Sequence, residues 1–135
     1  MFLVEDEFIV REGIKNNIDW AGEGFQFCGE AADGELALPL IQSEQPDIII
    51  SDLEMSGMDG RALCKHARRE SALSDIPFVI LSAFVDPEGS GNLADLPADG
   101  CLSKQIPVSD LVQLIRELLN ASHRRNNSQT GSDRT

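Results

Sequence analysis

Residues 47–52 have the sequence DIIISD, a run of three isoleucines that ends at an aspartate. Because the run does not alternate between apolar and polar positions, we expect both of its faces to be covered. A strand of this kind is typical of a parallel sheet that lies between two layers of helices. The run therefore predicts a central strand that carries the carboxylate of Asp52 at its carboxyl end.

Apolar runs alternate with amphipathic stretches on both sides of this strand. The other predicted strands cover residues 2–4, 25–31, 77–81 and 101–102, and the predicted helices cover 7–18, 33–43, a stretch after Asp59, and 108–119. This alternation predicts an α/β fold, a doubly wound five-stranded parallel sheet whose ligands bind beyond the carboxyl ends of the strands. Asp33, Asp59 and Asp110 stand near helix starts, where we expect them to act as caps.

The composition limits the classes of function. The chain has 135 residues, 41% hydrophobic and 25% charged, which suits one globular domain, expected at residues 1–119. Its net charge of −12 argues against direct binding to nucleic acid, which depends on Lys and Arg that neutralise phosphates. No apolar run reaches the ~18 residues of a membrane span, and the chain does not begin with a signal peptide. We therefore expect a cytoplasmic protein without a membrane partner.

The three cysteines, Cys28, Cys64 and Cys101, are far apart and form no CxxC pair. This spacing excludes the usual zinc sites and argues against a framework of disulfides. We expect three reduced thiols.

Charged and hydroxyl side chains follow most of the predicted strands, namely Glu5, Asp6, Asp52, Ser82 and Lys104. Carboxylates that are crowded together resist joint ionisation unless a cation lies between them, and such oxygen ligands suit Mg²⁺ together with a phosphate. An ionised aspartate is then available as a nucleophile toward phosphorus. The lysine and the hydroxyl would stabilise the phosphoryl oxygens, so the pattern predicts a site for phosphoryl transfer.

The chain resembles the receiver domains of two-component response regulators. The resemblance rests on the stretches LVEDE (residues 3–7), DLEMSGMDG (52–60), LSA (81–83) and LSK (102–104), and it covers residues 2 to about 119. It implies a flavodoxin-like sheet in the order 2-1-3-4-5 and a signalling switch that accepts a phosphoryl group. Such a domain is not an enzyme in the usual sense, because it catalyses only its own phosphorylation and dephosphorylation.

The resemblance also implies a metal site. Asp52 matches the aspartate that is phosphorylated, and it would share a Mg²⁺ ion with its neighbours. Asp6 matches the direct metal ligand, and Glu5 matches the residue that acts through water. Glu54 matches the position whose backbone carbonyl binds the metal.

The remaining roles and the partners follow from the same resemblance. Ser82 matches the hydroxyl that turns toward the phosphoryl group, and Lys104 matches the lysine that pairs with it. The implied phosphodonor is a phosphohistidine on a sensor histidine kinase or on a phosphotransfer domain. The opening stretch and residues 18–20 resemble receivers that precede transcription domains of the AraC class, so a DNA-binding output domain is expected in a full-length protein.

The chain departs from the family pattern at residues 85–100 and at Cys101, and two other features bear on its fold. Residues 85–100 hold two prolines and three glycines, so we expect the fourth helix to be weak or absent. Cys101 stands where the family has an aromatic residue that reads out the switch. Residues 120–135 are polar and without periodicity, which predicts a disordered tail or a linker. Pro39, inside a predicted helix, should kink that helix or delay its start.

Two other functions are compatible with the sequence. The departures at Cys101 and residues 85–100 suit a pseudo-receiver, a binding module that has lost phosphotransfer. Alternatively, Glu54 lies two residues after Asp52, the spacing of a second acid in hydrolases that form an aspartyl phosphate. The chain is short for the cap domain of such hydrolases.

Overall fold

A parallel sheet of five strands, in the order β2-β1-β3-β4-β5, forms the centre of the molecule. The strands are β1 Phe2–Val4, β2 Gly29–Ala31, β3 Ile49–Asp52, β4 Phe78–Ser82 and β5 Gly100–Ser103. The computed structural model describes residues 1–55, 57–82, 97–104 and 108–133, with side chains up to residue 121. The predicted doubly wound fold with the order 2-1-3-4-5 is confirmed.

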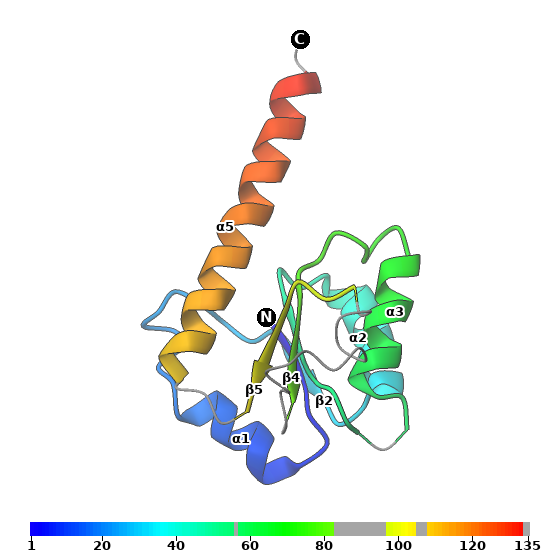
Figure 1. Ribbon diagram of the computed structural model, residues 1–135, viewed down its shortest axis with the longest axis vertical. Coiled ribbons are helices and arrows are strands. Elements are labelled where there is room, and N and C mark those ends of the chain that lie inside the picture. Colours follow the sequence, from blue (N-terminus) through cyan, green and yellow to red (C-terminus); the bar gives the residue numbers. More distant parts are fainter. Residues whose placement is uncertain (56, 83–96, 105–107, 134–135) are drawn as a thin grey trace, which may run out of the picture.

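The described helices form one layer on each side of this sheet. They are α1 Phe8–Asn16, α2 Gly34–Glu44, α3 Gly60–Arg69 and α5 Val108–Asp133. In Figure 1, α1 and α5 lie on one side of the strands, and α2 and α3 lie on the other. Among the described helices, none combines the length and the apolar content that crossing a bilayer requires.

The three central strands, β1, β3 and β4, bury both of their faces, as the run of isoleucines predicted for β3. Ile49 packs in the core under α2 and α3, whereas Ile48 and Ile50 pack in the core under α1 and α5. All three isoleucines are fully buried. Phe2 and Leu3 of β1 divide between the two cores in the same way. The centre of the sheet is therefore closed to solvent on both faces, and its polar side chains lie at the ends of the strands.

Two of the predicted helix caps are confirmed. The side chain of Asp33 accepts a hydrogen bond from the backbone N–H of Leu36 at the start of α2, and Asp59 accepts one from Ala62 at the start of α3. Asp110 lies in the first turn of α5 and not before it, so its expected role as a cap is wrong.

Two helices run differently from the prediction. Pro39 lies inside α2, yet the helix begins at Gly34 directly after its cap, so its start is not delayed. The last helix was predicted to end at Leu119, where the apolar periodicity ends, but α5 continues to Asp133. Residues 120–133 contain no proline, and extension of an existing helix does not require an apolar face. The division into a domain at 1–119 and a tail or linker at 120–135 stays a prediction.

The fourth helix was predicted to be weak or absent within residues 85–100. Residues 85–96 of that segment lie outside the described residues. The chain is described again from Pro97, and the backbone N–H of Asp99 donates to the carbonyl of Phe78 at 2.8 Å, directly before β5 begins.

Gly60→Ala is predicted to destabilise the fold. A Cβ at Gly60 would overlap the carbonyl oxygen of Asp52 and lie 2.9 Å from Oγ of Ser51, so the end of β3 would have to move. We expect the free energy of unfolding to fall by about 1–3 kcal/mol in chemical denaturation. The matched control is Gly13→Ala in α1, where the nearest atom to the new Cβ is 3.6 Å away and a gain of about 0.5–1 kcal/mol is expected. Equal effects at both positions would contradict this packing.

Candidate functional site

Three carboxylates meet at the carboxyl edge of the sheet. Glu5 and Asp6 directly follow β1, and Asp52 is the last residue of the neighbouring strand β3. One carboxylate oxygen from each residue lies within 4.8 Å of the other two. Glu5 is 1% exposed and Asp52 is 5% exposed, while Asp6 is half-buried. The predicted convergence of these three residues is therefore confirmed by the geometry.

Lys104 supplies a positive charge to this cluster. It directly follows β5, and its Nζ lies 2.7 Å from Oε1 of Glu5 and 3.1 Å from Oδ1 of Asp52. Its backbone N–H donates to the carbonyl of Ser82 at 2.8 Å, which fixes the chain at this point beside the end of β4. One ammonium thus pairs with two of the three acidic groups. The cluster keeps an excess of negative charge when all three are ionised.

The crowding shifts two protonation equilibria. Burial raises the pKa of Glu5 from its ordinary 4.5 to about 7; the neighbouring Asp52 adds to this shift, and the hydrogen bond from Lys104 opposes it. Burial by itself would lower the pKa of Lys104. The hydrogen bonds and charges of Glu5 and Asp52 outweigh that effect, so the pKa of Lys104 is raised and the ammonium stays protonated.

Ser82 also lies at this edge. It is the last residue of β4 and is buried, and its register partner is Ser103 of β5. In the adjoining pair of strands, Asp52 is level with Leu81, so Ser82 stands one residue further along than Asp52. The predicted hydroxyl is therefore next to the carboxylate cluster in the sheet.

The turn between β3 and α3 carries Glu54, whose side chain is exposed. The backbone N–H of Gly60 donates to the carbonyl of Leu53 at 3.1 Å, so the turn closes on itself. Gly57 has a φ of 78°, in the left-handed region that a glycine adopts without strain. This turn places the backbone after Asp52 at the edge of the sheet; the role of the Glu54 carbonyl as a metal ligand stays a prediction.

Arg11 is a neighbour of the cluster that the sequence analysis missed. It lies in α1, and its Nη1 donates to the backbone carbonyl of Glu5 at 2.6 Å. Its Nε is 3.4 Å from Oε2 of Glu30 in β2, and Lys15 pairs with the same carboxylate at 3.0 Å. A single arginine on an amphipathic helix carries no pattern that would have distinguished it from a solvated surface residue.

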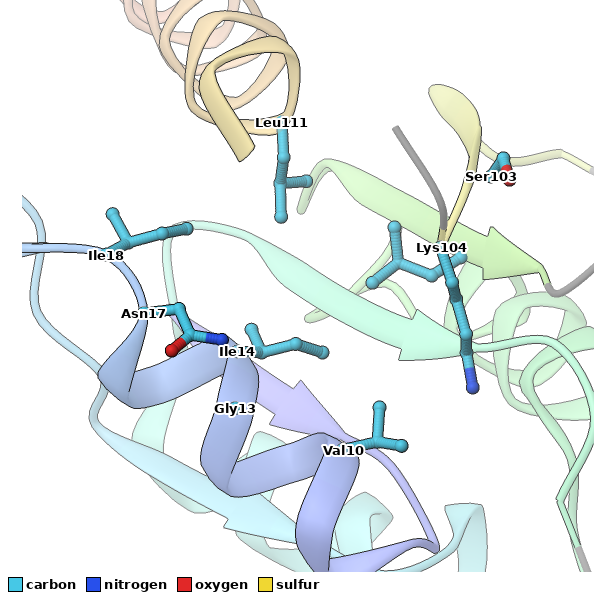
Figure 2. Close-up of a pocket in the computed structure, with 9 residues that line it drawn as sticks. Val10, Gly13, Ile14, Asn17, Ile18, Ser103, Lys104 and Leu111 are labelled. Atoms are coloured by element: carbon cyan, nitrogen blue, oxygen red, sulfur yellow. The ribbon is translucent and has the colours of Figure 1, made fainter. Parts of the chain in front are cut away.

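An apolar cavity of about 270 Å³ flanks the site between α1 and α5. Figure 2 shows Val10 and Ile14 of α1 facing Leu111 of α5 across it, with the side chain of Lys104 at its edge. The cavity also explains why α1 has no fully buried residue, since that helix does not close tightly against its neighbour. The three carboxylates are not among the residues that line this cavity, whereas Lys104 is, so Lys104 joins the two regions.

The donor set at the cluster fits a small divalent cation. Carboxylate oxygens are hard ligands of the kind that Mg²⁺ prefers, and Mg²⁺ is commonly held by one or two carboxylates with water and phosphate in the other positions. Glu5, Asp6 and Asp52 offer three such groups in one place. Two of them are buried, so their mutual repulsion is poorly screened by solvent, and a cation would relieve it.

Comparison with known proteins agrees with this geometry. The family described as the response regulator receiver domain matches residues 1–116. The chain is 33% identical over 123 residues to the uncharacterized transcriptional regulatory protein YesN of Bacillus subtilis. This alignment covers 87% of this chain and 33% of YesN. It is also 28% identical over 124 residues to the DNA-binding dual master transcriptional regulator RpaA of Synechocystis sp. That alignment covers 92% of this chain and 50% of RpaA. The chain thus spans half or less of the length of these relatives.

A solved structure gives the same result for the fold. The signal receiver domain of a signal transduction histidine kinase from Syntrophus aciditrophicus superposes with a TM-score of 0.79 at 28% identity. The superposition covers 89% of each chain.

The raised pKa of Glu5 predicts a pH dependence of stability in the metal-free protein. Between pH 4.5 and about 7 the folded state keeps a proton on Glu5 that the unfolded state has released, so the free energy of unfolding should fall as the pH rises through this range. Glu5→Gln removes this contribution. Denaturation in EDTA should therefore show wild type losing stability relative to Glu5→Gln over that range.

The control for this measurement is Glu117→Gln, which changes an exposed carboxylate on α5. It should leave the difference from wild type nearly constant across the same range. A constant difference for Glu5→Gln as well would show that Glu5 titrates normally and would contradict the described crowding.

Proposed function

The chain belongs to the response regulator receiver domain family, and from this premise we propose that it is a phospho-accepting signalling domain. It takes a phosphoryl group onto Asp52 in a Mg²⁺-dependent reaction and relays the signal by a conformational change. The observation that carries the proposal is the meeting of Glu5, Asp6, Asp52 and Lys104 at one edge of the sheet.

In this proposal, four acidic residues contribute to metal binding in different ways. Asp6 and Asp52 provide carboxylate oxygens, Glu5 acts through water, and Glu54 contributes its backbone carbonyl. When bound, Mg²⁺ neutralises the cluster and draws in the oxygens of the incoming phosphoryl group. The burial of Glu5 and Asp52 supports cation binding at this cluster, because buried carboxylates gain more from a counter-charge than exposed ones.

Asp52 is the nucleophile in this proposal. An oxygen of its carboxylate attacks phosphorus, the bond between phosphorus and the donor nitrogen breaks, and an acyl phosphate forms on Asp52. Lys104, already 3.1 Å from Asp52, keeps its ammonium beside the oxygens of the transferred group. Ser82 turns its hydroxyl toward the same oxygens, and this movement begins the conformational change.

The partners follow from the same role. The donor is a phosphohistidine on a sensor histidine kinase or on a phosphotransfer domain, and the protein acts in the cytoplasm. The relatives named as transcriptional regulators are longer than this chain, which supports a separate output domain that binds DNA in the full-length protein.

The receiver itself does not bind nucleic acid, in line with its net charge of −12. Its catalysis is limited to its own phosphorylation and dephosphorylation.

Labelling with a small phosphodonor tests the proposal. Incubation with acetyl phosphate and Mg²⁺ should add one phosphoryl group to the wild type, detected by intact mass, and EDTA should prevent it. Asp52→Ala should abolish the labelling. The matched control is Asp47→Ala, which removes an exposed aspartate just before the same strand and should leave labelling unchanged. Wild type that stays unlabelled, or Asp52→Ala that still labels, would refute the proposal.

A further inference from the structure

The turn that follows β1 carries two of the three carboxylates, and a residue of α1 holds it in place. The carbonyl of Glu5 accepts a hydrogen bond of 2.6 Å from Nη1 of Arg11. We propose that Arg11 is a positioning residue, which fixes the turn of Glu5 and Asp6 so that their carboxylates meet Asp52 around a divalent cation. This inference rests on the proposed function.

The hydrogen bond acts on the peptide unit between the two acidic residues. The carbonyl of Glu5 and the N–H of Asp6 belong to one planar group, so a donor that fixes the first also fixes the second. On its other side, the N–H of Glu5 donates to the carbonyl of Ala31 in β2 at 3.0 Å. The backbone of Glu5 is therefore held from both directions, by β2 through the sheet and by α1 through Arg11.

The guanidinium of Arg11 is itself held in place. Its Nε lies 3.4 Å from Oε2 of Glu30, and its Cζ lies 5.6 Å from the centre of the Phe8 ring. The Arg11 side chain is 15% exposed. Because Nε has no hydrogen-bond partner among the described residues, Glu30 orients the guanidinium by charge, and the short directed bond of Nη1 goes to Glu5. Lys15 fixes Glu30 in turn, at 3.0 Å.

This contact matters because the geometry of a metal site depends on the groups behind its ligands. Loss of such a supporting partner typically weakens metal binding about 10–100-fold. The helix α1 has no fully buried residue, so its polar contacts with β2 and the turn carry much of its placement. Arg11 makes both kinds of contact, since it pairs with Glu30 of β2 and donates to the carbonyl of Glu5 in the turn.

Positioning and simple electrostatics predict opposite results when Arg11 is removed. A cation near the cluster repels Mg²⁺, so its loss would by charge alone make Mg²⁺ bind more tightly. If Arg11 holds the turn, its loss makes Mg²⁺ bind more weakly despite the added negative charge. The sign of the change therefore separates the two effects.

The test is the dissociation constant of Mg²⁺, measured by titration calorimetry on wild type, Arg11→Ala and Arg11→Lys. We expect Arg11→Ala to weaken binding by about tenfold. Arg11→Lys keeps the charge but not the planar fork, so it should recover part of the loss. Melting temperatures in EDTA are measured in parallel, so that a general loss of stability is distinguished from a loss of metal affinity.

Arg116 in α5 provides a matched control. It makes the same three kinds of contact, an ion pair of 2.7 Å with Glu23, a hydrogen bond to the carbonyl of Glu23 and a position over the Phe25 ring. These contacts lie away from the carboxylate cluster. Arg116→Ala should change the dissociation constant of Mg²⁺ by less than about twofold, within what an exposed ion pair contributes.

The outcomes are distinguishable. If wild type binds Mg²⁺ and Arg11→Ala binds it equally or more tightly, the positioning role is wrong and the proposed function stands. If wild type itself does not bind Mg²⁺, the proposed function fails. Should Arg11→Ala not fold, Arg11→Lys carries the test, because it keeps the charge and loses the planar fork; weaker Mg²⁺ binding than in wild type supports the role, and an unchanged constant overturns it.

Discussion

The repulsion among three carboxylates at one edge of the sheet is the constraint on which the rest of the structure depends. Glu5, Asp6 and Asp52 bring their oxygens within 4.8 Å of one another, and Lys104 is the ammonium that pairs with two of them. Such a cluster is stable only where the backbone is held firmly, because side chains that are free to turn would separate. Central strands that are buried on both faces give that rigidity and leave their carboxyl ends for polar chemistry.

The helices hold the site to different degrees. Capped by Asp59, α3 follows the turn after β3 and packs so closely that a Cβ at Gly60 would overlap the backbone of Asp52. In contrast, α1 rests on the sheet without a fully buried residue, beside an apolar cavity, and depends more on its ion pairs. Asp52, the proposed phosphate acceptor, thus sits on a rigid strand, while part of the proposed metal site is carried by a turn that a less tightly packed helix supports. This contrast is the physical basis for the role assigned to Arg11.

Much of this architecture could be predicted from the sequence, because it depends on local patterns. The isoleucine run before Asp52 predicted the buried strand, and charged residues after successive strands predicted which side chains meet. The contacts of Arg11 could not be predicted, since they join a helix to residues 6 and 19 positions away and leave no periodicity. The end of α5 could not be predicted either, because the apolar periodicity stops at Leu119 while the helix continues to Asp133. At Cys101, burial raises the pKa of the thiol and keeps it protonated, as expected of a packed cysteine and not of a reactive one.

The central claim is that the carboxylate cluster is a cation site, and a crystal structure of the chain with Mn²⁺ in place of Mg²⁺ tests it most directly. The account predicts one anomalous peak at coordinating distance from carboxylate oxygens of both Asp6 and Asp52, with the backbone carbonyl of Glu54 turned toward it. Lys104 should remain beside Asp52 without occupying the position of the ion. A cluster without a peak at millimolar Mn²⁺ would contradict the account.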